Sequence, residues 1–215
     1  MIKFSLFAIR FSLKSRTFAR RKETKGFMTL RMDFLTAALS VSLAVFSQPA
    51  GVVLDTLQVK HVDFRGKTQE GIIVCNKLIS QDLREIFAAL YQAQYPIERI
   101  RPISEYGDDD ERSMQANNTS CYCYRPIEGS RKLSNHARGL AIDVNPLYNP
   151  CVRRRQDGTL LIQPATGKPY VDRSRAFKYK ITRRDLCYRL FTQHGFKWGG
   201  AWRSLKDYQH FEKAE

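Results

Sequence analysis

The stretch SNHARGLAIDVNP, residues 134–146, has the clearest structural pattern in this sequence. Apolar side chains stand at every second position of its second half, at Leu140, Ile142 and Val144. This is the period of a β-strand that buries one face, and the proline that follows ends the strand because it cannot donate a ladder hydrogen bond. The pattern therefore predicts a strand whose other, exposed face presents Asp143.

A histidine precedes a glycine turn in the same stretch. Gly139 is able to fold the chain back on itself, so that His136 and Asp143 come to one point. A single histidine is more often structural than a metal ligand. An imidazole nitrogen beside a carboxylate oxygen, however, is a donor pair that binds metal ions, so these two residues are candidate ligands.

The segment DYQHFE, residues 207–212, supplies a second candidate histidine, His210. Two histidines and one carboxylate leave the fourth corner of a tetrahedral zinc site open for water, as catalytic zinc sites do and closed structural sites do not. Zinc lowers the pKa of a bound water toward about 7, and hydrolysis then needs a nearby base to take its proton. Asp207, three residues before His210, is the candidate for that second carboxylate.

The other two histidines have weaker claims to a functional role. His194 stands beside Gly195 at the expected end of a helix, where an imidazole interacts favourably with the helix dipole, which is a structural use. His61 lies in a charged stretch and has no evident partner in the sequence. We therefore expect neither residue to bind the metal.

Two helices are expected around these motifs. Residues 76–96 have apolar side chains at helical spacing until a proline ends the pattern. The inner face of this helix consists of Ile79, Leu83, Ile86, Phe87 and Leu90. A second helix is expected over residues 182–195. Thr182, with Asp185 three residues later, resembles a capping box, and Gly195 suits the C-terminal end.

The segments between these elements have simpler patterns. The folded domain is expected to begin near residues 52–62. Residues 96–106 have the pattern of an extended segment, and residues 107–120 that of a polar surface loop with at most one helical turn. Residues 152–172 contain the turn dipeptides Asp157-Gly158 and Thr166-Gly167, which indicate a segment that leaves the main body of the domain and returns as a β-hairpin.

The formal net charge of +15 in 215 residues suggests nucleic-acid binding at first. About half of this excess, however, lies in residues 1–31. Nucleic-acid binding would need basic residues clustered on one face together with aromatic stacking positions, whereas much of the excess charge lies in this N-terminal segment. We therefore expect no nucleic-acid partner, and 43% hydrophobic residues indicate an ordinary globular domain.

An uncharged apolar run follows the basic segment at residues 34–46. It is shorter than the roughly 20 residues that span a bilayer but matches the hydrophobic region of a signal peptide, with cleavage after Ser47. Met28 or Met32 would give a more usual start. A signal peptide, an uncleaved inner-membrane anchor and a buried helix all stay open. We expect residues 1–50 to be this extension and residues 51–215 to be the functional domain.

Five cysteines are present: Cys75, Cys121, Cys123, Cys151 and Cys187. In an oxidising compartment they are compatible with up to two disulfides and one free thiol. Their spacing matches no zinc knuckle, so a structural role is expected for them.

The two motifs together resemble the zinc peptidase family of bacterial D-alanyl-D-alanine carboxypeptidases and L-alanyl-D-glutamate endopeptidases, which includes vancomycin-resistance peptidases and phage endolysins. The family pattern is Ser-x-His-x-x-Gly-x-Ala-x-Asp, followed later by an acid-x-x-His. Its fixed positions are filled here by Ser134, His136, Gly139, Ala141, Asp143, Asp207 and His210. The resemblance covers about residues 60–213. Residues 108–126 also resemble one subgroup of the family, but Tyr122 and Tyr124 stand where that subgroup usually has a phenylalanine and an asparagine.

This resemblance implies roles for individual residues. It implies that zinc is bound by His136, Asp143 and His210. It also implies that Asp207 is the general base, and aspartate at this position resembles the endopeptidase-type members, because some relatives use glutamate.

Further roles follow from the same resemblance. An arginine before the first histidine stabilises the oxyanion of the tetrahedral intermediate, an effect often worth about 3 kcal/mol. Arg125 and Arg112 are the candidates, and Arg125 is favoured because it lies in an extended segment just before the metal loop. Ser134 either binds substrate or caps the loop, and Trp198 and Trp202 either line a cleft or pack in the core.

The implied fold is a small α+β domain of the Hedgehog and DD-peptidase type. It has a mainly antiparallel sheet, with helices on one face and the zinc site on the other. The implied function is hydrolysis of a bond in the peptidoglycan stem peptide by an exported, periplasmic or cell-envelope monomer. Whether the enzyme is a carboxypeptidase or an endopeptidase stays open, and the alternative is a non-catalytic zinc-containing domain that binds the cell wall.

Overall fold

The structure, a computed structural model, describes residues 49–214, which lie within one compact unit, Val45–Glu215. The predictions for the basic segment 1–31 and the apolar run 34–46 fall outside the described residues. Within the described range, no helix combines the length and the apolar character needed to cross a membrane.

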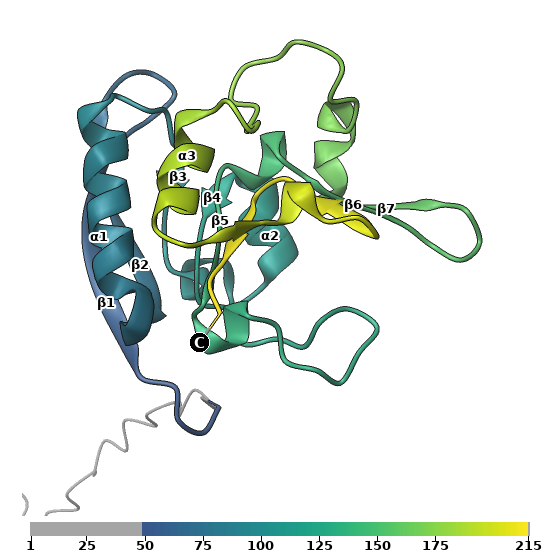
Figure 1. The fold of residues 1–215 in the computed structure, drawn as a ribbon, viewed down its shortest axis with the longest axis horizontal. Helices are drawn as coiled ribbons and strands as arrows, with labels where there is room; N and C mark the ends of the chain where they lie inside the picture. The colour runs from purple at the N-terminus through teal and green to yellow at the C-terminus, as the bar shows by residue number, and fades with distance from the viewer. Residues whose placement is uncertain (1–48, 215) are drawn as a thin grey trace, which may run out of the picture. The chain divides into compact units, whose positions relative to one another are not determined.

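The described part begins with a β-hairpin packed against a helix. Strands β1 (Leu54–Val62) and β2 (Thr68–Asn76) pair antiparallel, and α1 (Lys77–Gln92) runs alongside them (Figure 1). Asn76 caps α1, because its side-chain oxygen accepts a hydrogen bond from the amide of Leu78 at 3.0 Å. The predicted apolar face of the helix is buried in full: Ile79, Leu83, Ile86, Phe87 and Leu90.

A three-stranded antiparallel sheet forms the centre of the fold. It consists of β5 (Ala141–Asp143), β10 (His210–Glu212) and β8 (Lys197–Trp198), in the order β5-β10-β8. Phe211 of β10 stacks on Phe191 of α3 (Leu186–Gln193), with the ring centroids 4.4 Å apart. Because side chains alternate between the two faces of a strand, His210 points to the face opposite the one that Phe211 packs into the core.

A second three-stranded sheet has the order β7-β6-β9 and contains the predicted hairpin. Strands β6 (Cys151–Arg154) and β7 (Leu160–Gln163) form an arm that projects from the body (Figure 1), and β9 (Leu205–Asp207) pairs with β6. The Asp157-Gly158 turn is confirmed. The Thr166-Gly167 turn is wrong, because both residues lie in the 3-10 helix Ala165–Tyr170.

The segment between α1 and β5 differs from its prediction. Strands β3 (Arg99–Ile100) and β4 (Asn118–Thr119) pair in parallel, and the elements between them are the 3-10 helix Ile103–Tyr106 and helix α2 (Asp110–Gln115). Residues 96–106 are therefore extended only in their first part.

The predicted surface loop is buried at its end. Asn117, Asn118 and Thr119 are buried, because amide side chains satisfy backbone groups of other segments. Asn118 accepts from the Arg101 amide at 2.8 Å, and Asn117 accepts from the Leu147 amide at 3.0 Å.

Two local predictions need correction. The N-cap of α3 is Asp185 and not Thr182, since the Asp185 carboxylate accepts from the Cys187 amide at 2.8 Å. All five cysteines are free thiols, so none of the disulfides that an oxidising compartment would allow is present. Burial raises the pKa of both Cys75 and Cys123 to about 12, which makes these thiols unreactive core groups. The predicted fold class, α+β with mainly antiparallel strands, is confirmed, although the strands form several small sheets.

Candidate metal centre

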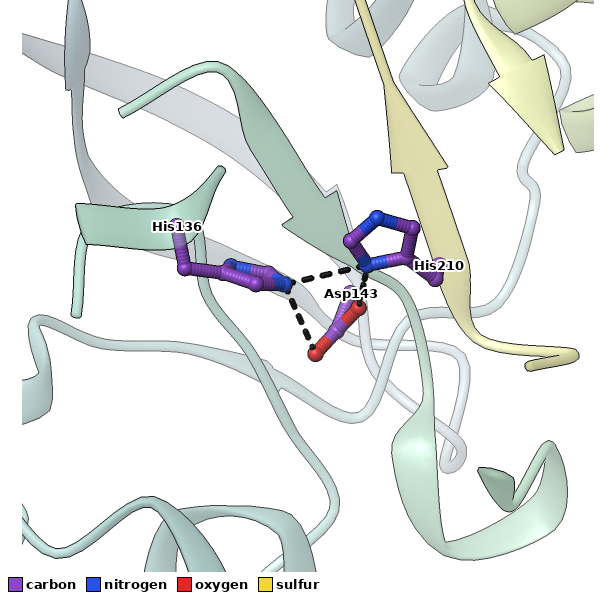
Figure 2. Close-up of side chains that lie close together, drawn as sticks. All are labelled: His136, Asp143 and His210. Atoms are coloured by element: carbon purple, nitrogen blue, oxygen red, sulfur yellow. Dashed lines mark hydrogen bonds and ion pairs between the residues drawn. The ribbon is translucent and has the colours of Figure 1, made fainter. Parts of the chain in front are cut away.

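His136, Asp143 and His210 come together from three separate elements, the 3-10 helix His136–Arg138, β5 and β10 (Figure 2). His210 Nδ1 lies 3.1 Å from both His136 Nε2 and Asp143 Oδ1. His136 Nε2 lies 3.3 Å from Asp143 Oδ2. All three residues are buried, and one ligand atom of each lies within 4.8 Å of the other two, so the three side chains form a compact triangle.

The turn at Gly139 brings the first two ligands together. Gly139 has a φ of +67°, in the left-handed region that favours glycine. A Cβ atom at this position would lie 2.5 Å from the backbone nitrogen of Asn76. The turn therefore packs directly against the junction of β2 and α1, and the carbonyl of Gly139 accepts a hydrogen bond from the Asn76 amide at 2.9 Å.

The register of β5 and β10 brings in the third ligand. His210 pairs directly with Asp143 across these antiparallel strands. The sequence pattern predicted that Asp143 lies on an exposed face of its strand, but its exposed fraction is 4%. The prediction fails because β5 is covered on both faces, by the core on one side and by the two imidazoles on the other.

A backbone contact fixes the tautomer of His136. Nδ1 of this ring lies 2.7 Å from the carbonyl oxygen of Cys121. A carbonyl only accepts hydrogen bonds, so Nδ1 carries the hydrogen and the lone pair of Nε2 points at Asp143 and His210. An imidazole with one nitrogen held by a backbone carbonyl and the other free to coordinate is typical of protein metal sites.

The geometry of this triangle fits a zinc ion. Zinc binds histidine nitrogen and carboxylate oxygen at about 2.0–2.2 Å in a tetrahedron, whose corners are then about 3.3–3.6 Å apart. The two imidazole nitrogens lie 3.1 Å apart, which is close to that edge. Each nitrogen also lies near one oxygen of Asp143, at 3.1 Å from Oδ1 for His210 and at 3.3 Å from Oδ2 for His136. The donor types and their spacing are therefore those of a site with three protein ligands.

The charges of the ligands also suit a cation. Burial favours the protonated form of Asp143, but His136 and His210 outweigh this effect and hold the pKa of the carboxyl far below its usual range. Burial opposes the charge on His210, but its bonds to Asp143 and Glu212 raise the pKa of the imidazole to about 10. In the metal-free protein a proton on His210 thus compensates the Asp143 charge at neutral pH.

The triangle opens into a cavity of about 490 Å³, which Asp207 also lines. Asp207 Oδ1 is buried and has no hydrogen-bond partner in the described part of the protein. Burial, reinforced by the charge of Asp143, raises the pKa of Asp207 to about 6. A buried carboxylate oxygen without a partner is unusual, and it is available to accept a proton from a molecule in the cavity.

The structure separates the two arginine candidates. Arg125 lines the cavity, and its Nε lies 2.7 Å from Oδ2 of Asp110, which also lines it. Arg112 is exposed on α2 and is not among the residues that line the cavity. Of these two candidates, Arg125 is therefore the one that is placed to meet a molecule bound there.

Of the other residues that the sequence analysis singled out, some line the cavity and one lies in the core. Ser134 is buried in the cavity wall, and its hydroxyl accepts a hydrogen bond from the His136 amide at 3.2 Å, so it caps the metal loop. Trp202 lines the cavity, with its ring 5.2 Å from that of His210. Trp198 instead belongs to the core, where its indole donates to the carbonyl of Tyr208 at 2.9 Å.

Two acidic residues of the site were missed by sequence reasoning. Asp110 holds Arg125, and Glu212 contacts His210. Asp110 lies among several neighbouring acids that the sequence does not distinguish. The contact of Glu212 with His210 could have been predicted from the sequence, because residues two positions apart in a strand lie on the same face.

A small α+β fold with two histidines, an aspartate and a second carboxylate with one partner-free oxygen at the same cavity defines a candidate metal-dependent hydrolase. Residues 128–213 match the model of a protein family described as D-alanyl-D-alanine carboxypeptidase. This part of the chain, which holds all three candidate ligands and Asp207, is therefore similar to that peptidase family. No curated protein and no solved structure gave a significant match. Arg125 and Asp110 lie before the matched segment.

Proposed function

We propose that this protein is a zinc-dependent peptidase that hydrolyses a peptide bond in the stem peptide of peptidoglycan. The observation that carries the proposal is that Asp207, whose buried Oδ1 has no hydrogen-bond partner in the described part of the protein, lines the same cavity as the His136, Asp143 and His210 triangle. The family match over residues 128–213 supports the same class of reaction.

The residues that line the cavity have different roles in the proposed peptide hydrolysis. His136, Asp143 and His210 would hold the zinc ion, which when bound supplies a Lewis acid that polarises a carbonyl and acidifies water. Asp207, in its ionised form, takes a proton from the attacking water and delivers it to the leaving amine. Its partner-free oxygen leaves this carboxylate ready for that exchange.

Arg125 has the electrostatic role in this proposal. Its guanidinium places a fixed positive charge at the cavity, and the ion pair with Asp110 holds it in position. Such a charge stabilises the oxyanion that develops when water attacks a carbonyl carbon. The role needs no rearrangement of the protein, since Arg125 already lines the cavity.

The proposal also covers where the protein acts and what its two segments do. Peptidoglycan lies outside the inner membrane, so we propose that residues 1–50 direct export or anchor the chain there and that residues 51–215 act as a monomeric peptidase domain in the cell envelope. About half of the net charge of +15 lies in residues 51–215, and this positive charge suits contact with an anionic cell wall.

Digestion of purified muropeptides by the intact protein tests the proposal. The protein is incubated with zinc, with a chelator, and with zinc added back after chelation, and the products are analysed by mass spectrometry. We expect cleavage only in the zinc-containing samples. Loss of a terminal alanine identifies a carboxypeptidase, and scission within the stem identifies an endopeptidase.

The competing function is a zinc-containing domain that binds the cell wall without turnover. Binding alone needs no base, so this function gives no reason for a buried carboxylate oxygen without a partner at Asp207. If the zinc-loaded protein binds muropeptides and releases no product, the non-catalytic function replaces the proposed one.

A further inference from the structure

We propose that Glu212 and Asn135 form a brace that orients His210 and ties it to the segment carrying His136. Glu212 is then a positioning residue of the metal centre, acting through His210. The inference deepens the proposed function and rests on it only in taking zinc as the ion that the three ligands hold.

Both contacts of the brace end on the same carboxylate oxygen. Oε2 of Glu212 lies 3.3 Å from Nε2 of His210, and it accepts a hydrogen bond from Nδ2 of Asn135 at 2.6 Å. His210 and Glu212 share one face of β10 because they are two positions apart in the strand. The carboxylate therefore lies between the outer nitrogen of His210 and the amide of Asn135.

This arrangement selects the ring atom that faces the metal. An ionised carboxylate only accepts hydrogen bonds, so Nε2 of His210 carries a hydrogen toward Glu212. In the neutral ring the lone pair then belongs to Nδ1, the atom that lies 3.1 Å from Asp143 Oδ1. In His136 it is Nε2 that faces Asp143, because Nδ1 is held by the carbonyl of Cys121. In each histidine, the partner of the outer nitrogen therefore sets which nitrogen faces the metal site.

The brace also connects two motifs that are far apart along the chain. Asn135 directly precedes His136, so its bond to Glu212 links the first ligand segment to the last. Two backbone bonds run beside it: the Asn135 carbonyl accepts from the Leu140 amide at 2.9 Å, and the Leu140 carbonyl accepts from the Lys213 amide at 3.0 Å. The side-chain brace and these backbone bonds fix the spacing of the two imidazoles.

The test compares zinc affinity in the intact wild-type protein, Glu212→Ala and Glu212→Gln, by competition with a chromophoric chelator. Partners of this kind typically contribute about 10–100-fold to metal affinity, so we expect a loss of this size in Glu212→Ala. We expect a smaller loss in Glu212→Gln, because an amide oxygen still accepts from both His210 and Asn135. If Glu212→Ala fails to fold, Glu212→Gln and Asn135→Ala carry the comparison.

A second histidine–carboxylate pair provides the matched control. His194 Nδ1 lies 3.1 Å from Oδ1 of Asp82, outside the metal centre. We expect Asp82→Asn to bind zinc like the wild type, although it loses an ion pair of similar type. Equal losses in Asp82→Asn and Glu212→Ala would reduce the role of Glu212 to general stability and overturn the inference.

A spectroscopic readout separates orientation from stability. Nitrogen NMR of the His210 ring in the zinc-loaded protein is expected to show the hydrogen on Nε2 in the wild type and in Glu212→Gln. Wild-type zinc affinity and an unchanged ring signal in Glu212→Ala would contradict the brace while leaving the proposed function intact. Conversely, a protein that binds zinc with this dependence on Glu212 but cleaves no stem peptide would contradict only the proposed function.

Discussion

His210 and Asp143 lie directly opposite each other in two antiparallel strands, with Nδ1 of the imidazole 3.1 Å from Oδ1 of the carboxylate. A slip of one residue in this pairing would turn one of the two side chains to the opposite face of the sheet. On that opposite face, Phe211 and Ile142 pair with each other and are fully buried. The apolar core therefore sets the register that assembles the candidate metal centre.

Replacing Gly139 by alanine tests how the turn holds the first ligands. An alanine there combines an unfavourable φ with a contact of 2.5 Å to the Asn76 backbone nitrogen. The conformation alone costs about 1–2 kcal/mol, and the clash adds to it, so we expect Gly139→Ala to lose more than this in the free energy of unfolding. The control is Gly158→Ala, where φ is +82° but the space is open. Equal destabilisation of the two variants would show that the close approach at Gly139 is unimportant.

Replacing Asp207 by asparagine tests the base. General acid–base catalysis contributes about 10²–10⁴-fold, so we expect a loss of kcat in this range, with bound zinc retained. Asparagine has nearly the same shape but accepts no proton. Steady-state kinetics on muropeptides and metal analysis of the same sample check both parts. Wild-type turnover in Asp207→Asn would remove Asp207 from the mechanism.

The same variant has a pH-dependent effect on stability. Burial raises the pKa of Asp207 from 3.8 to about 6 in the folded metal-free protein, so its ionised form is disfavoured there. The penalty is absent below the unfolded pKa and complete above the folded one. We therefore expect Asp207→Asn to stabilise the metal-free protein by up to about 3 kcal/mol above pH 7, and to lose this advantage as the pH falls to about 4. Denaturant unfolding at several pH values measures it, and a gain that grows toward low pH would contradict the assignment.

Metal binding is expected to release a proton from His210. The pKa of this imidazole is raised to about 10 in the metal-free protein, so the ring is protonated at neutral pH and must lose a proton to coordinate. Asp143 is already ionised and contributes none. Calorimetry of zinc binding in buffers of different ionisation enthalpy is expected to show release of about one proton from His210. A binding enthalpy independent of the buffer would contradict this protonation state.

Arg125 and Asp110 are expected to act together in catalysis. Loss of an oxyanion-stabilising group costs about 10²–10³-fold in kcat, so we expect a loss of this size in Arg125→Ala, with zinc affinity preserved. A smaller loss is expected in Asp110→Asn, which weakens the ion pair that holds the guanidinium. Arg112→Ala, on the exposed surface of α2, provides the control and is expected to behave like the wild type. A greater effect at Arg112 than at Arg125 would reverse the assignment.

Much of this site was predictable because its chemistry is encoded in short motifs. The spacing of His136, Gly139 and Asp143 indicated a turn that joins an imidazole to a carboxylate, and the structure brings them together at such a turn. The apolar face of α1 was equally clear, because helical periodicity is a local property.

The parts that sequence reasoning missed depend on contacts between distant segments. Asn117 and Asn118 looked like loop residues, yet they are buried because they bond to backbone groups near residues 101 and 147. The burial of Asp143 depends on the pairing of β5 with β10, which alternation within one strand does not reveal. The same holds for Asp110, whose role comes only from its contact with Arg125.

The most direct test of the account is the zinc content and affinity of the intact protein and of three variants, His136→Ala, Asp143→Ala and His210→Ala. We expect about one zinc ion per chain in the wild type and in Asp207→Asn, and a loss of stoichiometric zinc in each of the three ligand variants. Zinc bound with wild-type affinity in any one of those three would contradict the proposal that these side chains share a single metal ion.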